Sequence, residues 1–105
     1  MAYHGDAMDR DRIAAVVREH AAEIRARGVT RLDLFGSVAR GEADATSDID
    51  IVVDVAPGRK FSLIDLAGLR SLLRELLDHE ADVVVREDLR PGFRARIERE
   101  TVRVL

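Results

Sequence analysis

Two aspartates, Asp48 and Asp50, stand two positions apart in a segment where polar and apolar residues alternate. In a β-strand this spacing puts both carboxylates on one face, with about 6–7 Å between their Cα atoms. Two like charges at that range repel by about 0.7 kcal/mol in water and about 2–3 kcal/mol at an effective dielectric of about 20. A divalent cation turns this repulsion into coordination, and hard carboxylate oxygens select Mg²⁺, Mn²⁺ or Ca²⁺. The pair therefore predicts a metal site, with ordinary surface aspartates on an exposed edge strand as the alternative.

A second feature, the dipeptide Gly36-Ser37, precedes Asp48 by a gap of ten residues. A glycine that follows a strand lets backbone N–H groups approach a phosphate closely, and a serine hydroxyl adds another donor. Alone, such a dipeptide is most often a plain turn. Because attack on an α-phosphate requires charge neutralisation on the attacking and leaving oxygens, a phosphate cradle combined with clustered carboxylates indicates metal-dependent phosphate chemistry.

Alternation and helical periodicity place these residues in an α/β domain. Each element is bounded by a glycine, a proline or a polar run, and Pro91 is well placed to open the last helix. We expect helices at about 9–27, 61–79 and 91–100, one helical turn at 38–40, a polar loop at 42–47, and strands at 30–35, 48–55, 81–86 and 102–105.

The expected strands have one apolar and one acidic face, because side chains alternate across a sheet. The apolar face carries Leu32, Leu34, Ile49, Ile51, Val53, Val83 and Val85. The opposite face carries Arg31, Asp33, Asp48, Asp50, Asp54 and Asp82. This pattern predicts a small mixed sheet with helices on one face only, and it makes the acidic face the candidate site.

The residues around the two motifs resemble those of minimal nucleotidyltransferases of the DNA polymerase β superfamily. The resemblance is carried by 34–41 (LFGSVARG) and 47–53 (SDIDIVV), extends through 81–85 (ADVVV) and 91–105, and so covers nearly the whole chain. Members are often antitoxins paired with a small helical toxin of the HEPN class. The resemblance implies a polymerase β-type fold and transfer of AMP from Mg²⁺-bound ATP to a tyrosine hydroxyl of that toxin, which would silence it.

Residue by residue, the resemblance assigns the triphosphate to Gly36 and Ser37, and Mg²⁺, expected as two ions, to Asp48 and Asp50. Asp82 would complete the triad, either as a metal ligand or as the base for the acceptor hydroxyl. The larger superfamily members have a second domain for the base and the acceptor. Its absence here suggests that a partner completes the site.

Arg40 could contact the triphosphate or stabilise developing charge, since arginine matches phosphate geometry, or it could be a surface arginine or one paired with an aspartate. The three histidines, His4, His20 and His79, lack the spacing of a metal site; His20 is expected to pack on a helix and His79 to lie near a helix C-terminus. Asp33 and Asp54 are expected to support the site rather than bind the metal.

The composition narrows the range of partners. A net charge of −3 argues against broad nucleic-acid binding, and the absence of cysteine excludes thiolate metal sites and disulfides. With no apolar run of membrane-spanning length, we expect a cytoplasmic single domain over 1–105.

Three functions remain open from the sequence. The first is an enzyme that modifies a toxin encoded nearby, with surplus apolar positions in 61–77 as a possible partner face. The second is a non-catalytic antitoxin that binds and occludes its toxin. The third is an enzyme with a small-molecule acceptor, of the antibiotic-modifying type.

Overall fold

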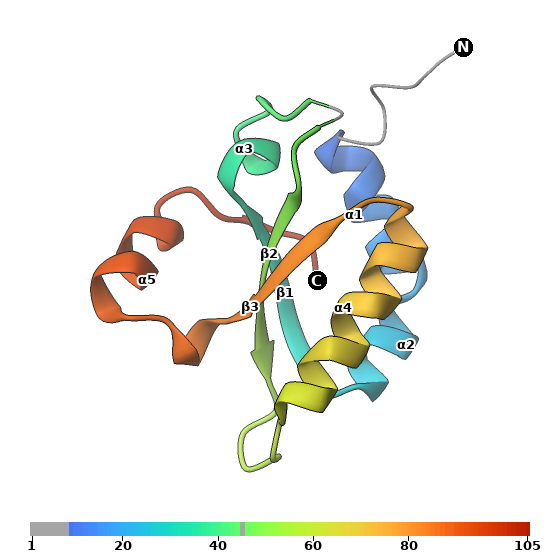
Figure 1. Ribbon diagram of the computed structural model, residues 1–105, viewed down its shortest axis with the longest axis vertical. Coiled ribbons are helices and arrows are strands. Elements are labelled where there is room, and N and C mark those ends of the chain that lie inside the picture. Colours follow the sequence, from blue (N-terminus) through green and yellow to red (C-terminus); the bar gives the residue numbers. More distant parts are fainter. Residues whose placement is uncertain (1–8, 45) are drawn as a thin grey trace.

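A computed structural model describes residues 9–44 and 46–105. One four-stranded mixed sheet, ordered β3-β2-β1-β4, runs through the centre of the molecule with helices around it (Figure 1). The α/β fold class is therefore confirmed. The elements are α1 (Arg10–Glu19), α2 (Ala21–Ala26), β1 (Val29–Phe35), α3 (Gly36–Ala39), β2 (Ile49–Val55), α4 (Leu63–Leu77), β3 (Ala81–Val85), the 3-10 helix η2 (Arg86–Asp88), α5 (Pro91–Glu98) and β4 (Val102–Arg103).

The N-terminal helical segment differs from the single helix expected at 9–27. It breaks at His20, whose backbone (φ −107°, ψ 24°) leaves the helical region and whose Nδ1 lies 2.9 Å from Glu23 Oε1. The apolar stripe nevertheless continues across the break, since Ile13, Val17 and Ile24 are all buried. His4 lies outside the described residues, and among those described no helix is long and apolar enough to span a bilayer.

The sheet joins strands of both orientations. β1 pairs antiparallel with β2 on one side and with β4 on the other. β2 and β3 are parallel because α4 carries the chain back along the sheet between them. Ser62 caps α4 reciprocally with Asp65, and Asp78 ends it in the left-handed conformation (φ 50°), which turns the chain directly into β3.

The apolar sheet face is confirmed as the main core. α1, α2 and α4 lie on that side (Figure 1), where Leu69 and Leu73 of α4 are fully buried. The expected face residues Leu32, Leu34, Ile49, Ile51 and Val53 are likewise fully buried, and Val83 and Val85 nearly so.

The expectation of helices on one face only was wrong in one respect, because α5 lies on the opposite side of the sheet (Figure 1). Ile97 of α5 packs there with Phe35 and Val52 in a second, smaller cluster. Phe35 and Val52 interrupt the aspartates along β1 and β2, so this face has an apolar strip that requires cover.

A buried guanidinium ties α5 to the same face. Arg86, 6% exposed at its side chain, donates to Asp33 Oδ2 at 2.7 Å, Asp54 Oδ1 at 2.6 Å and Glu98 Oε1 at 2.9 Å. Arg31 adds two 3.0 Å bonds to the fully buried Asp33. Hydrogen bonds to these carboxylates outweigh burial and raise the pKa of Arg86, so the guanidinium stays charged.

This network yields a stability prediction. Arg86→Ala leaves Asp33 buried with only part of its counter-charge, so the free energy of unfolding should fall by about 3 kcal/mol. The matched control is Arg74→Ala, which removes an exposed ion pair with Glu80 and should change stability by less than about 1 kcal/mol. Urea unfolding measures both, and equal losses would contradict a structural role for Arg86.

Candidate active site

Register brings two of the predicted site residues together. Asp50 of β2 lies opposite Phe35 of β1 on one side and opposite Asp82 of β3 on the other. Residues directly opposite each other in a sheet point to the same face, so the two carboxylates are neighbours on the acidic face. Asp48 lies one residue before β2 and is exposed, as is Asp82, whereas Asp50 is half-buried between them.

The glycine motif abuts this row. Gly36 begins α3 immediately after β1 and has φ +71°, a conformation that favours glycine. A Cβ at this position would collide with Asp50 Oδ2 and lie 3.2 Å from Asp50 Cγ. The ten-residue gap in the sequence therefore closes in space, and the backbone of the expected phosphate cradle touches a predicted metal ligand.

The short helix α3 is held firmly in place. Val38 and Ala39 are buried, and Arg10 Nη1 of α1 donates to the Ala39 carbonyl at 2.7 Å. Ser37 lies half-buried on the first turn, and its own carbonyl accepts the Glu42 N–H at 2.9 Å. A cradle anchored in this way keeps its geometry when a ligand arrives.

The electrostatics distinguish the aspartates of this face. Burial raises the pKa of Asp50, and the nearby charges of Asp82 and Asp48 raise it further. Asp33 and Asp54, in contrast, are both engaged by Arg86. Both carboxylates therefore belong to the ion-pair network around Arg86, a residue that the sequence patterns did not single out, and a supporting role at the site stays a prediction.

The carboxylates of the acidic face offer the oxygen ligands that Mg²⁺ prefers. Among residues 9–44 and 46–105, no three acidic or imidazole side chains already converge as a metal-binding group. Mg²⁺ usually takes one or two carboxylates and completes its shell with water and phosphate oxygens. The mutual repulsion at Asp50 and the glycine beside it suit that mode, so the donor set fits a cation that arrives with a triphosphate. Metal ligation by Asp48, Asp50 and Asp82 stays a prediction.

Arg40 ends α3 on the same side, but its partners are glutamates rather than an aspartate. Its Nε donates to Glu42 at 2.9 Å and its Nη1 to Glu100 at 3.0 Å. Its charge nevertheless lowers the pKa of Asp50, against the larger effects that raise it. Arg40 is thus close enough to influence the site, and its contact with the triphosphate stays a prediction.

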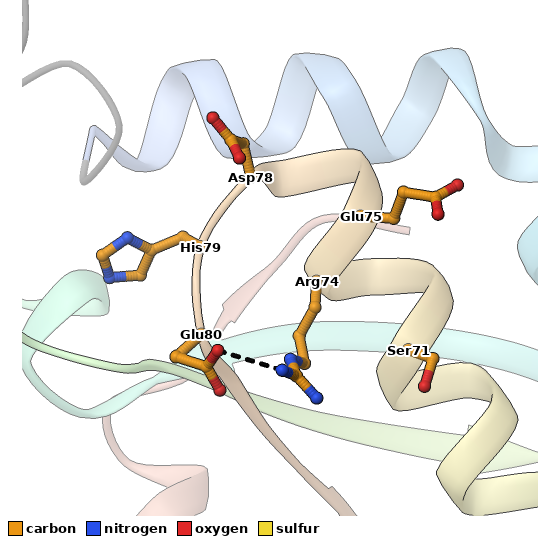
Figure 2. Close-up of a pocket in the computed structure, with 6 residues that line it drawn as sticks. All are labelled: Ser71, Arg74, Glu75, Asp78, His79 and Glu80. Atoms are coloured by element: carbon orange, nitrogen blue, oxygen red, sulfur yellow. Dashed lines mark hydrogen bonds and ion pairs between the residues drawn. The ribbon is translucent and has the colours of Figure 1, made fainter.

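An open groove of about 650 Å³ lies at the C-terminal end of α4 and along the segment that leads into β3 (Figure 2). Its lining includes the ion pair between Arg74 and Glu80, at 3.1 Å. His79, expected near a helix C-terminus, is confirmed there, two residues beyond the end of α4. Its imidazole Nε2 lies 2.6 Å from the Ser47 carbonyl oxygen, a contact that no pattern in the sequence indicated.

Gly36 provides a test of the cradle. Gly36→Ala should weaken nucleotide binding about tenfold or more, because the added Cβ pushes the Asp50 carboxylate aside. Gly58→Ala is the matched control, since Gly58 has a similar φ of +77° but open space around its missing Cβ. Calorimetric titration with a nonhydrolysable ATP analogue and Mg²⁺ measures both; equal affinities in the two variants would rule out the close approach as a functional feature.

Asp50 provides a second test, which needs no substrate. Because the pKa of Asp50 is raised, its carboxyl group binds a proton more tightly in the folded state than in the unfolded state. The ionised carboxylate therefore opposes folding at neutral pH. The free energy of unfolding should rise as the pH falls through the raised pKa and Asp50 becomes protonated. Asp50→Asn should therefore raise the melting temperature in EDTA at pH 7, while abolishing the further rise that Mg²⁺ and nucleotide give the wild type. A lower melting temperature in EDTA would show that the repulsion is not significant.

Comparison with known proteins agrees with this geometry. Residues 17–104 match the family described as the nucleotidyltransferase domain. A Methanocaldococcus jannaschii protein, named provisionally as a protein adenylyltransferase, is 45% identical over 74% of this chain and 82% of its own length. The protein adenylyltransferase MntA of Thermococcus cleftensis is 36% identical over 90% of this chain and 94% of its own.

Two solved structures share the fold. One, described provisionally as a minimal nucleotidyltransferase, has a TM-score of 0.70 and 39% identity, and the match covers 89% of each chain. The other, a tri-AMPylated Shewanella oneidensis HEPN toxin in complex with an MNT antitoxin, has a TM-score of 0.63 and 18% identity over 88% of this chain and 71% of that chain. The family match over residues 17–104 and the two sequence relatives place this chain in the nucleotidyltransferase domain family, among the minimal nucleotidyltransferases.

Proposed function

We propose that this chain is an antitoxin-type protein adenylyltransferase, which transfers AMP from Mg²⁺-bound ATP to a tyrosine hydroxyl of a HEPN-type toxin. The observation that carries the proposal is the contact of Gly36 with the Asp50 carboxylate, in register with Asp82. This contact supports a single site in which the predicted triphosphate-binding glycine and the predicted cation ligands lie side by side. The names of the relatives, protein adenylyltransferase and MNT antitoxin, support the choice of AMP as the transferred group and of a toxin as the acceptor.

The reaction is a substitution at the α-phosphorus. The acceptor oxygen forms a bond to the α-phosphorus, the bond from that phosphorus to the bridging oxygen of the β-phosphate breaks, and pyrophosphate leaves. Asp48 and Asp50 would hold Mg²⁺, which would supply charge neutralisation for the α-phosphate and the departing pyrophosphate. Asp82 either shares in holding the cation or accepts the hydroxyl proton as the acceptor attacks. Backbone N–H groups of Gly36 and Ser37 would bind the triphosphate, and Arg40 would contact it after exchanging its bonds to Glu42 and Glu100.

The partner has a physical role in this scheme. Asp48 and Asp82 are exposed, so the site faces solvent and needs a second surface to exclude water from the reacting groups. A toxin laid across the acidic face would provide that cover and present its hydroxyl in line with the leaving group. The attached nucleotides would then leave negative charge on the toxin after the antitoxin departs.

Leu63 and Ile64 are candidates for a contact away from the site. They are 84% and 83% exposed at the N-terminal end of α4, whereas Asp82 follows its C-terminal end. A partner that contacts both regions must extend along the helix, about 22 Å for the 15 residues of α4. These two side chains account for part of the apolar surplus noted in the sequence.

Co-expression with the neighbouring toxin tests the proposal. The purified toxin should gain the mass of one or more AMP units with the wild-type chain and none with Asp48→Asn, because that variant loses a ligand to the cation. Asp88→Asn, which removes an exposed carboxylate of the 3-10 helix η2 that is not among the predicted site residues, is the charge-matched control and should leave modification intact.

Two results would favour the alternatives. An unmodified toxin that is held in a tight complex and becomes active when the chain is removed would indicate inhibition by occlusion. Modification of small molecules alone, with the toxin present and unmodified, would indicate an enzyme of the antibiotic-modifying type.

A further inference from the structure

The segment that leaves α4 makes two bonds to the chain at the start of β2. The imidazole Nε2 of His79 lies 2.6 Å from the carbonyl oxygen of Ser47. One residue further on, the Glu80 carbonyl accepts the Ile49 N–H at 3.0 Å. These contacts fall on the residues immediately before and after Asp48, so residues 79–80 hold the backbone on both sides of a predicted metal ligand.

The direction of the first bond follows from its chemistry. A carbonyl oxygen only accepts, so Nε2 of His79 carries the proton and donates. The 2.6 Å separation is shorter than the about 2.9–3.0 Å usual for N–H···O bonds, which indicates a close contact. Figure 2 shows the imidazole directed away from the Arg74–Glu80 ion pair. His79 thus lines the groove while its Nε2 is engaged by the Ser47 carbonyl.

This contact also couples two carboxylates. The backbone of Asp82 continues directly from His79 and Glu80, and β3 pairs with β2 through Asp50 and Asp82. Asp48 lies outside the regular ladder of β2, which begins at Ile49. The His79 bond to Ser47 thus continues the pairing of the two strands two residues beyond the Ile49–Ala81 pair, and it restrains the position of Asp48 relative to Asp50 and Asp82.

We propose that His79 is a positioning residue for nucleotidyl transfer, which acts through the Ser47 carbonyl to hold Asp48 where the cation and the triphosphate need it. The role rests on the proposed function, and His79 touches neither substrate nor metal. Misplacement of a reacting group by about 1 Å can reduce catalysis by about a hundredfold. A backbone bond beside Asp48 can therefore influence turnover more than it influences folding.

Two polar variants of different reach test the proposal. The amide nitrogen of Gln can occupy the place of Nε2, whereas Asn is one methylene shorter and cannot reach Ser47. We expect His79→Gln to keep kcat/KM for transfer within about threefold of wild type, and His79→Asn to lower it by about tenfold to a hundredfold. Mg²⁺-dependent nucleotide affinity should follow the same order. His20→Asn is the matched control at the junction of α1 and α2, and it should behave as wild type.

Hydrogen exchange at the Ile49 amide gives a readout that is independent of activity. Exchange should accelerate in His79→Asn but not in His79→Gln or His20→Asn, with all variants folded by circular dichroism. Equal kinetics, affinity and exchange in His79→Asn and wild type would overturn the positioning role. Equal loss in the folded Gln and Asn variants would overturn it as well, since the donor would then not matter. If the wild type lacks transfer activity, the proposed function fails, while affinity and exchange still decide the role of His79.

Discussion

The guanidinium of Arg86 bonds carboxylates from β1, β2 and α5, and the acidic face of the sheet is arranged around that contact. Asp33 and Asp54 are both paired with it, Arg31 adds a second positive charge at Asp33, and the bond to Glu98 ties α5 to the sheet. The apolar strip of Phe35 and Val52, covered by Ile97, then separates these paired carboxylates from Asp50 and Asp82. Arg86 and the apolar strip thus divide the acidic face into two parts. In one part the carboxylates are paired with arginines and stabilise the fold, and in the other they are available to bind ligands.

The part available to ligands retains an interaction that does not favour folding. Asp50 is crowded by burial, by Asp82 and by Asp48, and its pKa is raised, whereas a neutral residue there would remove the repulsion. A protein retains such strain where function requires it, and in the proposed function a divalent cation that arrives with the nucleotide would supply the missing positive charge. Gly36 fits the same interpretation, because its missing Cβ leaves room for Asp50 beside the cradle. The backbone of the site is therefore already in position, whereas, among the described residues, the negative charges of its aspartates are not balanced by positive charge.

The alternation of polar and apolar residues predicted those features of the fold that depend on neighbouring residues in the sequence. Alternation located β1, β2 and β3 to within a residue or two, and it assigned Leu34, Ile51 and Val83 to the core because period two decides the face. The motif spacing predicted that Gly36 and Asp50 belong to one site. The helix break at His20 and the cover by α5 depend on tertiary packing, which outweighs periodicity at single positions. Arg86 was missed because one arginine after a strand, among many in the chain, carries no sign that three distant carboxylates converge on it.

The central claim is that this site transfers a nucleotide, and the fate of each phosphate of ATP tests it most directly. ATP labelled at the α-phosphorus, and separately at the γ-phosphorus, would be incubated with the chain, Mg²⁺ and a candidate HEPN-type toxin. The account predicts that the toxin acquires the α-label only, and that the γ-label is recovered in pyrophosphate. Transfer of the γ-label to the toxin, or its release as inorganic phosphate with no α-label transferred, would contradict the account.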